Sequence, residues 1–263
     1  MTLHVESAGD GEPLVLVHGF TQSSTGGGRF GERLAARRRL LMVDAPGHGR
    51  SGHDTVDLWM AGDLLADVTD GADVLGYSMG GRIALHAAIR RPDRVGRLVL
   101  IGATAGLDGD TAREDRRRAD HVLADGIERD GLPAFLDRWL SGPLFAGLDA
   151  EAAGREQRLA NRPEGLAATL RHRGTGDQEP LWPRLGEITV PSLVIAGEHD
   201  DRFRAVGERL VTGLGGPAEL HVVAGAGHAA HLERPHEVAH TVAEWLDRPV
   251  ASGSLSRTGG SPR

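Results

Sequence analysis

Short, continuous runs of aliphatic and β-branched residues alternate along the chain with stretches whose apolar residues recur at helical spacing. Continuous apolar runs are typical of strands that are buried on both faces of a sheet. Strand followed by helix, repeated in this way, predicts an α/β fold with a mostly parallel central sheet flanked by helices. The pattern predicts strands at 13–17, 40–43, 72–75, 97–101, 192–196 and 220–223, and helices at 58–68, 79–90, 203–214 and 236–246.

One long stretch interrupts this alternation. Between residues 107 and 184 no buried strand pattern appears, and the sequence is helical in character and rich in Arg, Asp, Glu and Ala. We therefore expect a core formed by residues 1–106 and 185–250, with 107–184 inserted as a helical cap (lid) over the site. Residues 251–263 are rich in Gly, Ser, Arg and Pro, which predicts a disordered tail.

The composition narrows the classes of function. A chain of 263 residues fits one domain with a substantial core, and its formal net charge of −7 gives no global positive field for nucleic acid or an anionic membrane. The N-terminal residues lack the pattern of a signal peptide, and no apolar run is long enough to cross a bilayer. We therefore expect a soluble, cytoplasmic protein. The absence of cysteine excludes disulfides and thiol nucleophiles.

Residues 76–81 read Gly-Tyr-Ser-Met-Gly-Gly, a GxSxG pattern centred on Ser78. An apolar strand enters it and a helical pattern leaves it, which is the context of a nucleophile elbow. Glycines two residues before and after the serine fit such a turn because it is tight and strained. In a chain with 38 glycines the alternative is an ordinary glycine-rich turn with a solvated serine.

Two later strands end in an acid and a histidine. Strand 192–196 leads to Asp200, and the following strand leads to His228 on a glycine-rich loop. The order serine, aspartate, histidine is the order that α/β-hydrolase enzymes use. Each residue comes from its own strand end at one edge of the sheet, so we predict a catalytic triad of these three. Asp201 competes with Asp200 for the orienting role, and its position fits a turn or surface carboxylate better.

The first buried strand ends in His-Gly-Phe at residues 18–20. In a hydrolase elbow one oxyanion donor is the backbone N–H after the nucleophile, here Met79, and another comes from this earlier loop, here Phe20. The alternative for Phe20 is an ordinary turn. Histidines at 228, 231, 236 and 240 lie close in sequence, but their spacing matches no familiar metal-ligand set, so we expect no metal site.

Arginines are concentrated in the predicted cap. A charge run on a helix is usually a solvated face, whereas an arginine that points down from a lid can clamp a substrate carboxylate. The sequence pattern leaves both possibilities open for each residue, and aromatic residues such as Trp139 can equally be part of the cap core. The cap arginines in question are Arg113, Arg116, Arg117, Arg118, Arg155, Arg158 and Arg162.

Together these segments resemble the α/β-hydrolase superfamily over nearly the whole chain. More narrowly, the sequence is similar to the 2-succinyl-6-hydroxy-2,4-cyclohexadiene-1-carboxylate synthases of menaquinone biosynthesis. The likeness is carried by residues 16–21, 44–49, 76–82, 197–200 and 225–231 in the core, and by 113–120, 135–139, 143–145, 157–159, 166–170 and 181–185 in the cap. Residues 24–30, Ser-Thr-Gly-Gly-Gly-Arg-Phe, depart from the family, which usually has a helix start containing tryptophan there.

The resemblance implies a lyase that eliminates pyruvate from 2-succinyl-5-enolpyruvyl-6-hydroxy-3-cyclohexene-1-carboxylate, a small anionic carboxylate substrate, with no cofactor or metal. Ser78, with Asp200 and His228, would take the proton α to the succinyl ketone. The positions that match the family's substrate-binding residues are Tyr77, Arg82, Arg116, Trp139 and Arg158.

Two other functions remain open at this point. The first is a hydrolase of esters, lactones or carbon–carbon bonds that uses the same triad, since the fold alone does not fix the reaction. An apolar cap without inward arginines favours that alternative. The second is a ligand-binding receptor in which catalysis is incidental, and the intact serine, aspartate and histidine set argues against it.

Overall fold

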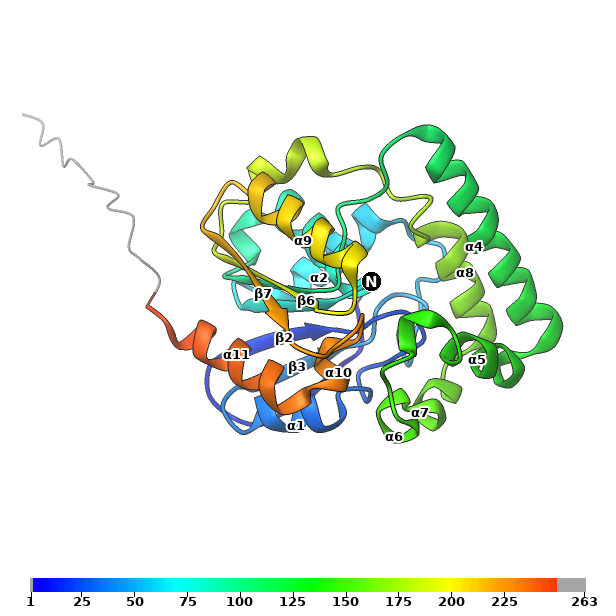
Figure 1. The fold of residues 1–263 in the computed structure, drawn as a ribbon, viewed down its shortest axis with the longest axis horizontal. Helices are drawn as coiled ribbons and strands as arrows, with labels where there is room; N and C mark the ends of the chain where they lie inside the picture. The colour runs from blue at the N-terminus through cyan, green and yellow to red at the C-terminus, as the bar shows by residue number, and fades with distance from the viewer. Residues whose placement is uncertain (1, 250–263) are drawn as a thin grey trace, which may run out of the picture.

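A computed structural model describes residues 2–249 and contains a seven-stranded sheet (Figure 1). The strand order is β1-β3-β2-β4-β5-β6-β7, and all neighbouring strands are parallel except β1, which pairs antiparallel with β3. The strands are β1 (Val5–Ala8), β2 (Pro13–Val17), β3 (Arg39–Val43), β4 (Asp73–Tyr77), β5 (Leu98–Ile101), β6 (Ser192–Gly197) and β7 (Ala218–Val223). The predicted fold class, a mostly parallel sheet flanked by helices, is confirmed.

Each of the six strands predicted from apolar runs exists, but some elements of the core were not predicted, among them one strand and one helix near the N-terminus. Strand β1 has the sequence Val-Glu-Ser-Ala and lies at the sheet edge with its residues half-buried or exposed, so it carries no continuous apolar run. Helix α1 (Gly28–Ala35) begins at the last of three consecutive glycines, and its N-cap Gly27 supplies no side-chain hydrogen bond. Both elements therefore lack the local signals on which sequence-based prediction depends.

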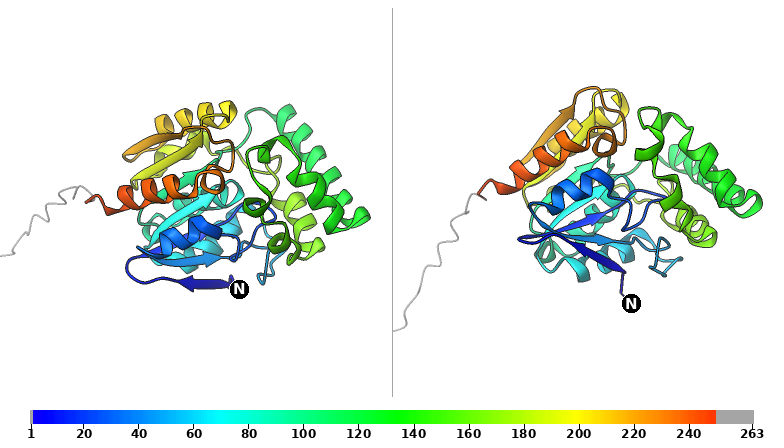
Figure 2. Two further views of the ribbon diagram at one scale, coloured as in Figure 1. Left: turned by 60° about the horizontal axis from the view of Figure 1, so that its bottom comes forward. Right: turned by 90° about the horizontal axis from the view of Figure 1, so that it is seen from below.

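Helices cover both faces of the sheet (Figures 1 and 2). One apolar cluster joins one face to α2 (Leu58–Thr69), α3 (Met79–Arg90) and α9 (Asp201–Gly213). A second cluster joins the other face to α1, α10 (Ala230–Glu233) and α11 (Pro235–Asp247). Because both faces are buried, the central strands read as unbroken apolar runs.

The helices between β5 and β6 stand together beside the sheet, as the green and yellow-green ribbons of Figure 2 show. They have an apolar cluster of their own, which includes Phe135, Leu136 and Leu166. After these helices the chain returns to the core, where Leu181 is buried and its N–H donates to the carbonyl of Ala105 over 2.7 Å. The cap helices are α4 (Asp110–Asp130), α5 (Leu132–Leu140), α6 (Ala150–Ala153), α7 (Arg155–Leu159) and α8 (Pro163–Arg173).

The carboxyl ends of the parallel strands point towards the cap. In open α/β sheets ligands bind at this edge, so the fold places the candidate residues between the sheet and the cap. Within residues 2–249 no helix is both long enough and apolar enough to cross a membrane. The predicted disordered tail at 251–263 lies outside the described residues.

Candidate active site

The serine of the GxSxG pattern lies in a strained turn. Ser78 has φ 49°, a left-handed conformation that is costly for a residue with a side chain. The glycines on either side make the turn possible. A Cβ on Gly76 would lie 2.6 Å from the carbonyl carbon of Gly80, and a Cβ on Gly80 would overlap the carbonyl oxygen of Val17. The pattern is therefore a nucleophile elbow in its backbone, as the sequence predicts.

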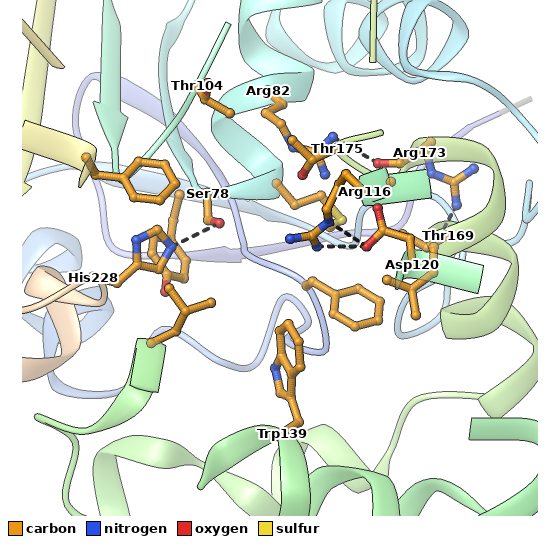
Figure 3. Close-up of a pocket in the computed structure, with 18 of the residues that line it drawn as sticks. Ser78, Arg82, Thr104, Arg116, Asp120, Trp139, Thr169, Arg173, Thr175 and His228 are labelled. Atoms are coloured by element: carbon orange, nitrogen blue, oxygen red, sulfur yellow. Dashed lines mark hydrogen bonds and ion pairs between the residues drawn. The ribbon is translucent and has the colours of Figure 1, made fainter. Parts of the chain in front are cut away.

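The structure brings together the three residues predicted to form a triad. The Oγ of Ser78 lies 3.3 Å from Nε2 of His228, and Nδ1 of the same ring lies 2.9 Å from Oδ2 of Asp200. Figure 3 shows the serine hydroxyl facing the imidazole across the pocket. This geometry allows His228 to take a proton from the serine while the carboxylate fixes the ring tautomer.

Asp200, and not Asp201, faces the histidine. The carboxylate of Asp200 also caps helix α9, because its Oδ1 accepts from the N–H of Phe203 over 3.2 Å. Partial burial raises the pKa of Asp200, but the hydrogen bonds from His228 and Phe203 outweigh it and the net pKa lies below the usual value. The side chain of Asp201 is 90% exposed and pairs with Arg204. Asp200 is thus a permanently charged partner for the imidazole at neutral pH.

Two backbone amides are free to bind an oxyanion. Phe20 and Met79 both line the cavity beside Ser78, and among residues 2–249 neither N–H has a hydrogen-bond acceptor. Gly19 permits the close approach of this loop, because a Cβ there would lie 2.6 Å from the ring of Tyr77. The two amides therefore offer unused donors at the serine, which is the arrangement an oxyanion hole needs.

Two buried histidines hold the loop that carries Phe20. The Nε2 of His18 accepts from the N–H of Ala45 over 3.1 Å, and the Nε2 of His48 accepts from the N–H of Thr21 over 3.3 Å. Each Nδ1–H donates to a nearby backbone carbonyl. Burial lowers the pKa of His18 to about 4 and lowers the pKa of His48 well below its usual value. Both rings are therefore neutral, which their acceptor role requires.

The neutral histidines make stability depend on pH. Burial also lowers the pKa of His86 to about 4 and that of His231 to about 3. Below pH 6.5 these histidines bind protons in the unfolded chain, whereas in the folded protein their rings stay neutral. The contribution of these rings to the free energy of unfolding is therefore fully present above pH 6.5. It decreases as the pH is lowered below 6.5, by at most about 1.4 kcal/mol per pH unit for each ring. Urea unfolding is expected to give a clearly lower midpoint at pH 5 than at pH 7.5.

Two variants test whether the buried histidines cause this sensitivity to acid. His18→Asn keeps a polar side chain but removes one titrating group, so its unfolding free energy should change less between pH 7.5 and pH 5. His236 is exposed, and His236→Asn should keep the wild-type pH dependence. Equal urea midpoints for the wild type at the two pH values would rule out the protonation of buried histidines as the cause.

A cavity of about 900 Å³, part of it open to solvent, lies between the elbow and the cap. Arg82, Arg116 and Arg173 gather on one side of it, Ser78 and His228 lie on another, and Trp139 lies below them in the view of Figure 3. The side chains that line it include Phe20, Tyr77, Ser78, Met79, Arg82, Thr104, Arg116, Asp120, Trp139, Phe145, Arg158, Thr169, Arg173, Thr175, Arg202, Phe203 and His228.

Three arginines of the lining are almost fully buried and have no carboxylate partner within residues 2–249. Arg82 donates to the carbonyl of Arg173 over 2.9 Å, and the Arg173 guanidinium donates to the carbonyls of Pro46, Asp54 and Val56. Arg158 donates to the carbonyls of Ala153 and Phe20 and to the hydroxyl of Thr21. Burial lowers the pKa of Arg82, Arg158 and Arg173 to about 10 each, so all three carry charge at neutral pH.

The cap arginines fall into two groups. Arg116 and Arg158 line the cavity, and Arg116 pairs with Asp120, the one carboxylate residue of the lining in the described chain. The others make surface ion pairs away from it, which the sequence pattern left undecided. These are Arg113 with Asp110, Arg117 with Glu114 and Asp177, Arg118 with Asp115, Arg155 with Asp137, and Arg162 with Asp54.

Aromatic side chains form part of the wall of the cavity. Trp139 stacks on Phe135 with ring centroids 5.9 Å apart and meets Phe20 and Phe145 edge-on at 5.5 and 5.7 Å. Tyr77 lies beside the imidazole of His228 at 5.6 Å, and burial raises the pKa of its hydroxyl, which stays protonated. This wall suits a flat, partly apolar ring, and the arginines suit acidic substituents on it.

Several lining residues were not predicted from the sequence, and three of them bear on the chemistry of the site. Arg173 lies in the last turn of α8, Asp120 lies in a run of charges on α4, and the ring of Phe203 contacts His228 with centroids 4.4 Å apart. Nothing in their local pattern separates them from surface residues. The one usable signal is that Phe203 lies three residues after Asp200, at the first turn of its helix.

Comparisons with known proteins agree with this geometry. Residues 14–241 match the sequence model of the alpha/beta hydrolase family. The chain belongs to the alpha/beta hydrolase family. Membership confirms the wider resemblance that the core motifs indicated.

Within this family, the chain is similar to proteins named 2-succinyl-6-hydroxy-2,4-cyclohexadiene-1-carboxylate synthase. A Bacillus subtilis protein provisionally given that name is 37% identical over 89% of this chain and 90% of its own length. The Citrobacter koseri protein of that name is 33% identical over 94% of this chain and 99% of its own length. These similarities confirm the narrower resemblance as well.

Solved structures similar to this chain include MenH from S. aureus and an esterase from Thermogutta terrifontis. The first has a TM-score of 0.85 and 30% identity, and covers 92% of this chain and 97% of its own. The second, titled as malate-bound, has a TM-score of 0.77 and 26% identity, and covers 93% of this chain and 92% of its own. Proteins with different named activities thus share this fold, so the reaction has to be argued from the site.

Proposed function

We propose that this protein is a 2-succinyl-6-hydroxy-2,4-cyclohexadiene-1-carboxylate synthase, a lyase that releases pyruvate from 2-succinyl-5-enolpyruvyl-6-hydroxy-3-cyclohexene-1-carboxylate. One structural observation supports this proposal in addition to the similarity to named relatives. Arg82, Arg158 and Arg173 are buried around the serine without a carboxylate partner among the described residues. Buried charges without counter-ions are costly, so their retention indicates an anionic ligand. The proposed substrate carries three carboxylates.

The chemistry begins at the ring carbon that bears the succinyl group. His228, oriented by Asp200, draws the proton from Ser78, and the serine oxygen takes the ring proton α to the ketone. Negative charge develops on the ketone oxygen, which the amides of Phe20 and Met79 are placed to bind. The residues therefore act as a base and an oxyanion hole, with no covalent intermediate.

Elimination follows from the same electron pair. The enolate electrons form the ring double bond next to the ketone, the existing double bond moves along the ring, and the carbon–oxygen bond to the enolpyruvyl group breaks. The leaving enolpyruvate takes a proton at its methylene carbon and becomes pyruvate. The product ring then has two conjugated double bonds, and water takes no part in the balance.

The arginines and the aromatic wall position this substrate. Guanidinium groups bind carboxylates through paired hydrogen bonds, and Arg116 and Arg158 reach the cavity from the cap while Arg82 reaches it from α3. Trp139 and Phe20, whose rings meet edge-on, offer apolar surface for the ring of the substrate. The arginines would thus bind the carboxylates while the aromatic side chains contact the ring.

The direct test is pyruvate release from the enolpyruvyl substrate, generated enzymatically and followed in a coupled assay. Wild-type protein should release pyruvate rapidly, and Arg116→Ala should lower kcat/KM about 10- to 100-fold, as expected for a lost charged hydrogen bond. Arg118→Ala is the matched control, because Arg118 lies on the same helix and pairs on the surface with Asp115. Its activity should equal that of the wild type.

A hydrolase is the second candidate, because the same elbow, histidine and amides can cleave an ester and a solved relative is titled an esterase. If simple aryl esters were turned over and no pyruvate appeared above background, the lyase would be rejected in favour of the hydrolase.

A further inference from the structure

Asp120 is a fully buried carboxylate in a cavity that otherwise presents arginines. Its Oδ1 accepts a hydrogen bond from Nε of Arg116 over 2.9 Å and forms an ion pair with the same guanidinium, 2.7 Å from Nη2. Figure 3 shows both contacts as dashed lines at the arginine end of the pocket. A fully buried aspartate is uncommon in proteins, because burying its charge is costly unless a cation or hydrogen-bond donor pairs with it.

The contact orients one edge of the arginine. Asp120 holds the edge formed by Nε and Nη2, and Nη1 has no hydrogen-bond partner within residues 2–249. The side chain of Arg116 is 37% exposed and lines the cavity. An arginine at a lid otherwise samples many rotamers, and ordering it on ligand binding costs free energy. The carboxylate therefore sets the direction in which Arg116 donates.

The surroundings are shaped around Asp120. Its Oδ2 is buried without a hydrogen-bond partner in the described chain and lies against Gly174, where a Cβ would come within 2.5 Å of this oxygen. Gly174 has φ −56°, a conformation open to any residue, so space and not backbone freedom favours glycine there. The charge of Asp120 also favours the protonated form of Arg82 and so raises its pKa, against the larger effect of burial.

We propose that Asp120 is a positioning residue for substrate binding, which holds the Arg116 guanidinium ready to receive a substrate carboxylate. The inference deepens the proposed function and rests on it for the identity of the substrate. Asp120 acts through Arg116 and does not itself bind the substrate, because its carboxylate would repel the carboxylates of an anionic ligand.

A second cap aspartate supplies the comparison. Asp177 accepts from Nε of Arg117 over 2.7 Å and also has a buried Oδ2 without a partner in residues 2–249. Neither member of this pair lines the cavity. If both carboxylates only stabilise the cap, replacing Asp120 and replacing Asp177 should have the same effect on ligand affinity. If Asp120 positions Arg116, only its replacement should weaken binding.

The test is a double-mutant cycle on ligand affinity. The probe is 2-succinylbenzoate, a stable aromatic dicarboxylate with the carbon skeleton of the proposed product, and its dissociation constant is measured by calorimetry. Arg116→Ala should weaken binding about 30-fold and Asp120→Asn about 10-fold, the range of a lost charged hydrogen bond. The double variant should bind no more weakly than Arg116→Ala, because Asp120 has nothing left to position.

Controls separate positioning from folding. Asp177→Asn should bind the probe within about 2-fold of wild type, as expected for a surface cap ion pair. Arg116→Lys keeps the charge but removes the planar edge that Asp120 holds, so it should lose about as much affinity as Asp120→Asn even if that variant folds poorly. In steady-state assays Asp120→Asn should raise KM more than it lowers kcat.

The outcomes are distinct from those of the proposed function. Additive losses in the cycle, equal weakening by Asp177→Asn, or a wild type that does not bind the probe would each overturn the role of Asp120. Absence of pyruvate release with the cycle as expected would instead reject the lyase and keep Asp120 as a positioning residue for a carboxylate ligand.

Discussion

Replacement of Ser78 by alanine is expected to lower kcat for pyruvate release by about 10⁴-fold or more. The hydroxyl is the group that faces Nε2 of His228 at 3.3 Å, and alanine leaves no atom there to carry the proton. The loss should lie in kcat, because the arginines that hold the substrate are unchanged. Affinity for 2-succinylbenzoate should therefore stay within about 2-fold of wild type.

The matched control is Ser192→Ala. Ser192 is a buried serine at the start of β6, at the strand end away from the cap, where its hydroxyl donates to the carbonyl of Val190 over 3.1 Å. Its loss should cost stability of about 1 kcal/mol and leave kcat unchanged. If Ser78→Ala kept more than a tenth of wild-type kcat, His228 would have to act on the substrate without the serine, and the proposed base would be wrong.

The second large effect is expected for Arg158→Met, with a fall in kcat/KM of about 10³-fold. This arginine joins two parts of the site, because its guanidinium lies in the cavity and also donates to the carbonyl of Phe20 and the hydroxyl of Thr21. Methionine removes a carboxylate ligand and frees the loop that carries an oxyanion donor. Steady-state kinetics on purified protein should show a lower kcat together with a higher KM.

Stability is expected to respond differently from activity. Methionine replaces a buried cation that has no carboxylate partner in the described chain, so the melting temperature should stay within a few degrees of wild type or rise. Arg155→Met is the control on the same helix, since Arg155 pairs with Asp137 on the surface. An equal loss of activity in both variants would show that α7 needs its charges for folding, and that Arg158 has no special place in the site.

The core and the triad could be predicted because their signals are local. Strands buried on both faces must be continuous apolar runs, and the tight turn at Ser78 must have glycines at 76 and 80, where a Cβ would collide with neighbouring backbone. In a parallel sheet the strands that lead to Asp200 and His228 end at the same edge, so the order of motifs along the chain was enough to predict their meeting. Their catalytic role remains a prediction until kcat is measured.

The cap could be predicted as a helical insertion but not in its orientation. The charge run on α4 offers Arg116, Arg117 and Arg118 in sequence, and helical geometry sends neighbours to different faces. Only the packing of α4 on α8 turns Arg116 to the cavity and the other two to surface carboxylates.

The sequence by itself determined the fold class, the elbow and the residues that meet at the strand ends, because these follow from apolar periodicity and from the space a tight turn allows. The tertiary structure decided the charge of the pocket. Arg158 and Arg173 are buried because helices from the insertion pack against loops more than 100 residues away in sequence. Asp120 pairs with Arg116 four residues earlier on α4, and the tertiary packing decides only that this pair faces the cavity. No local pattern encodes which face of a charged helix such packing will cover.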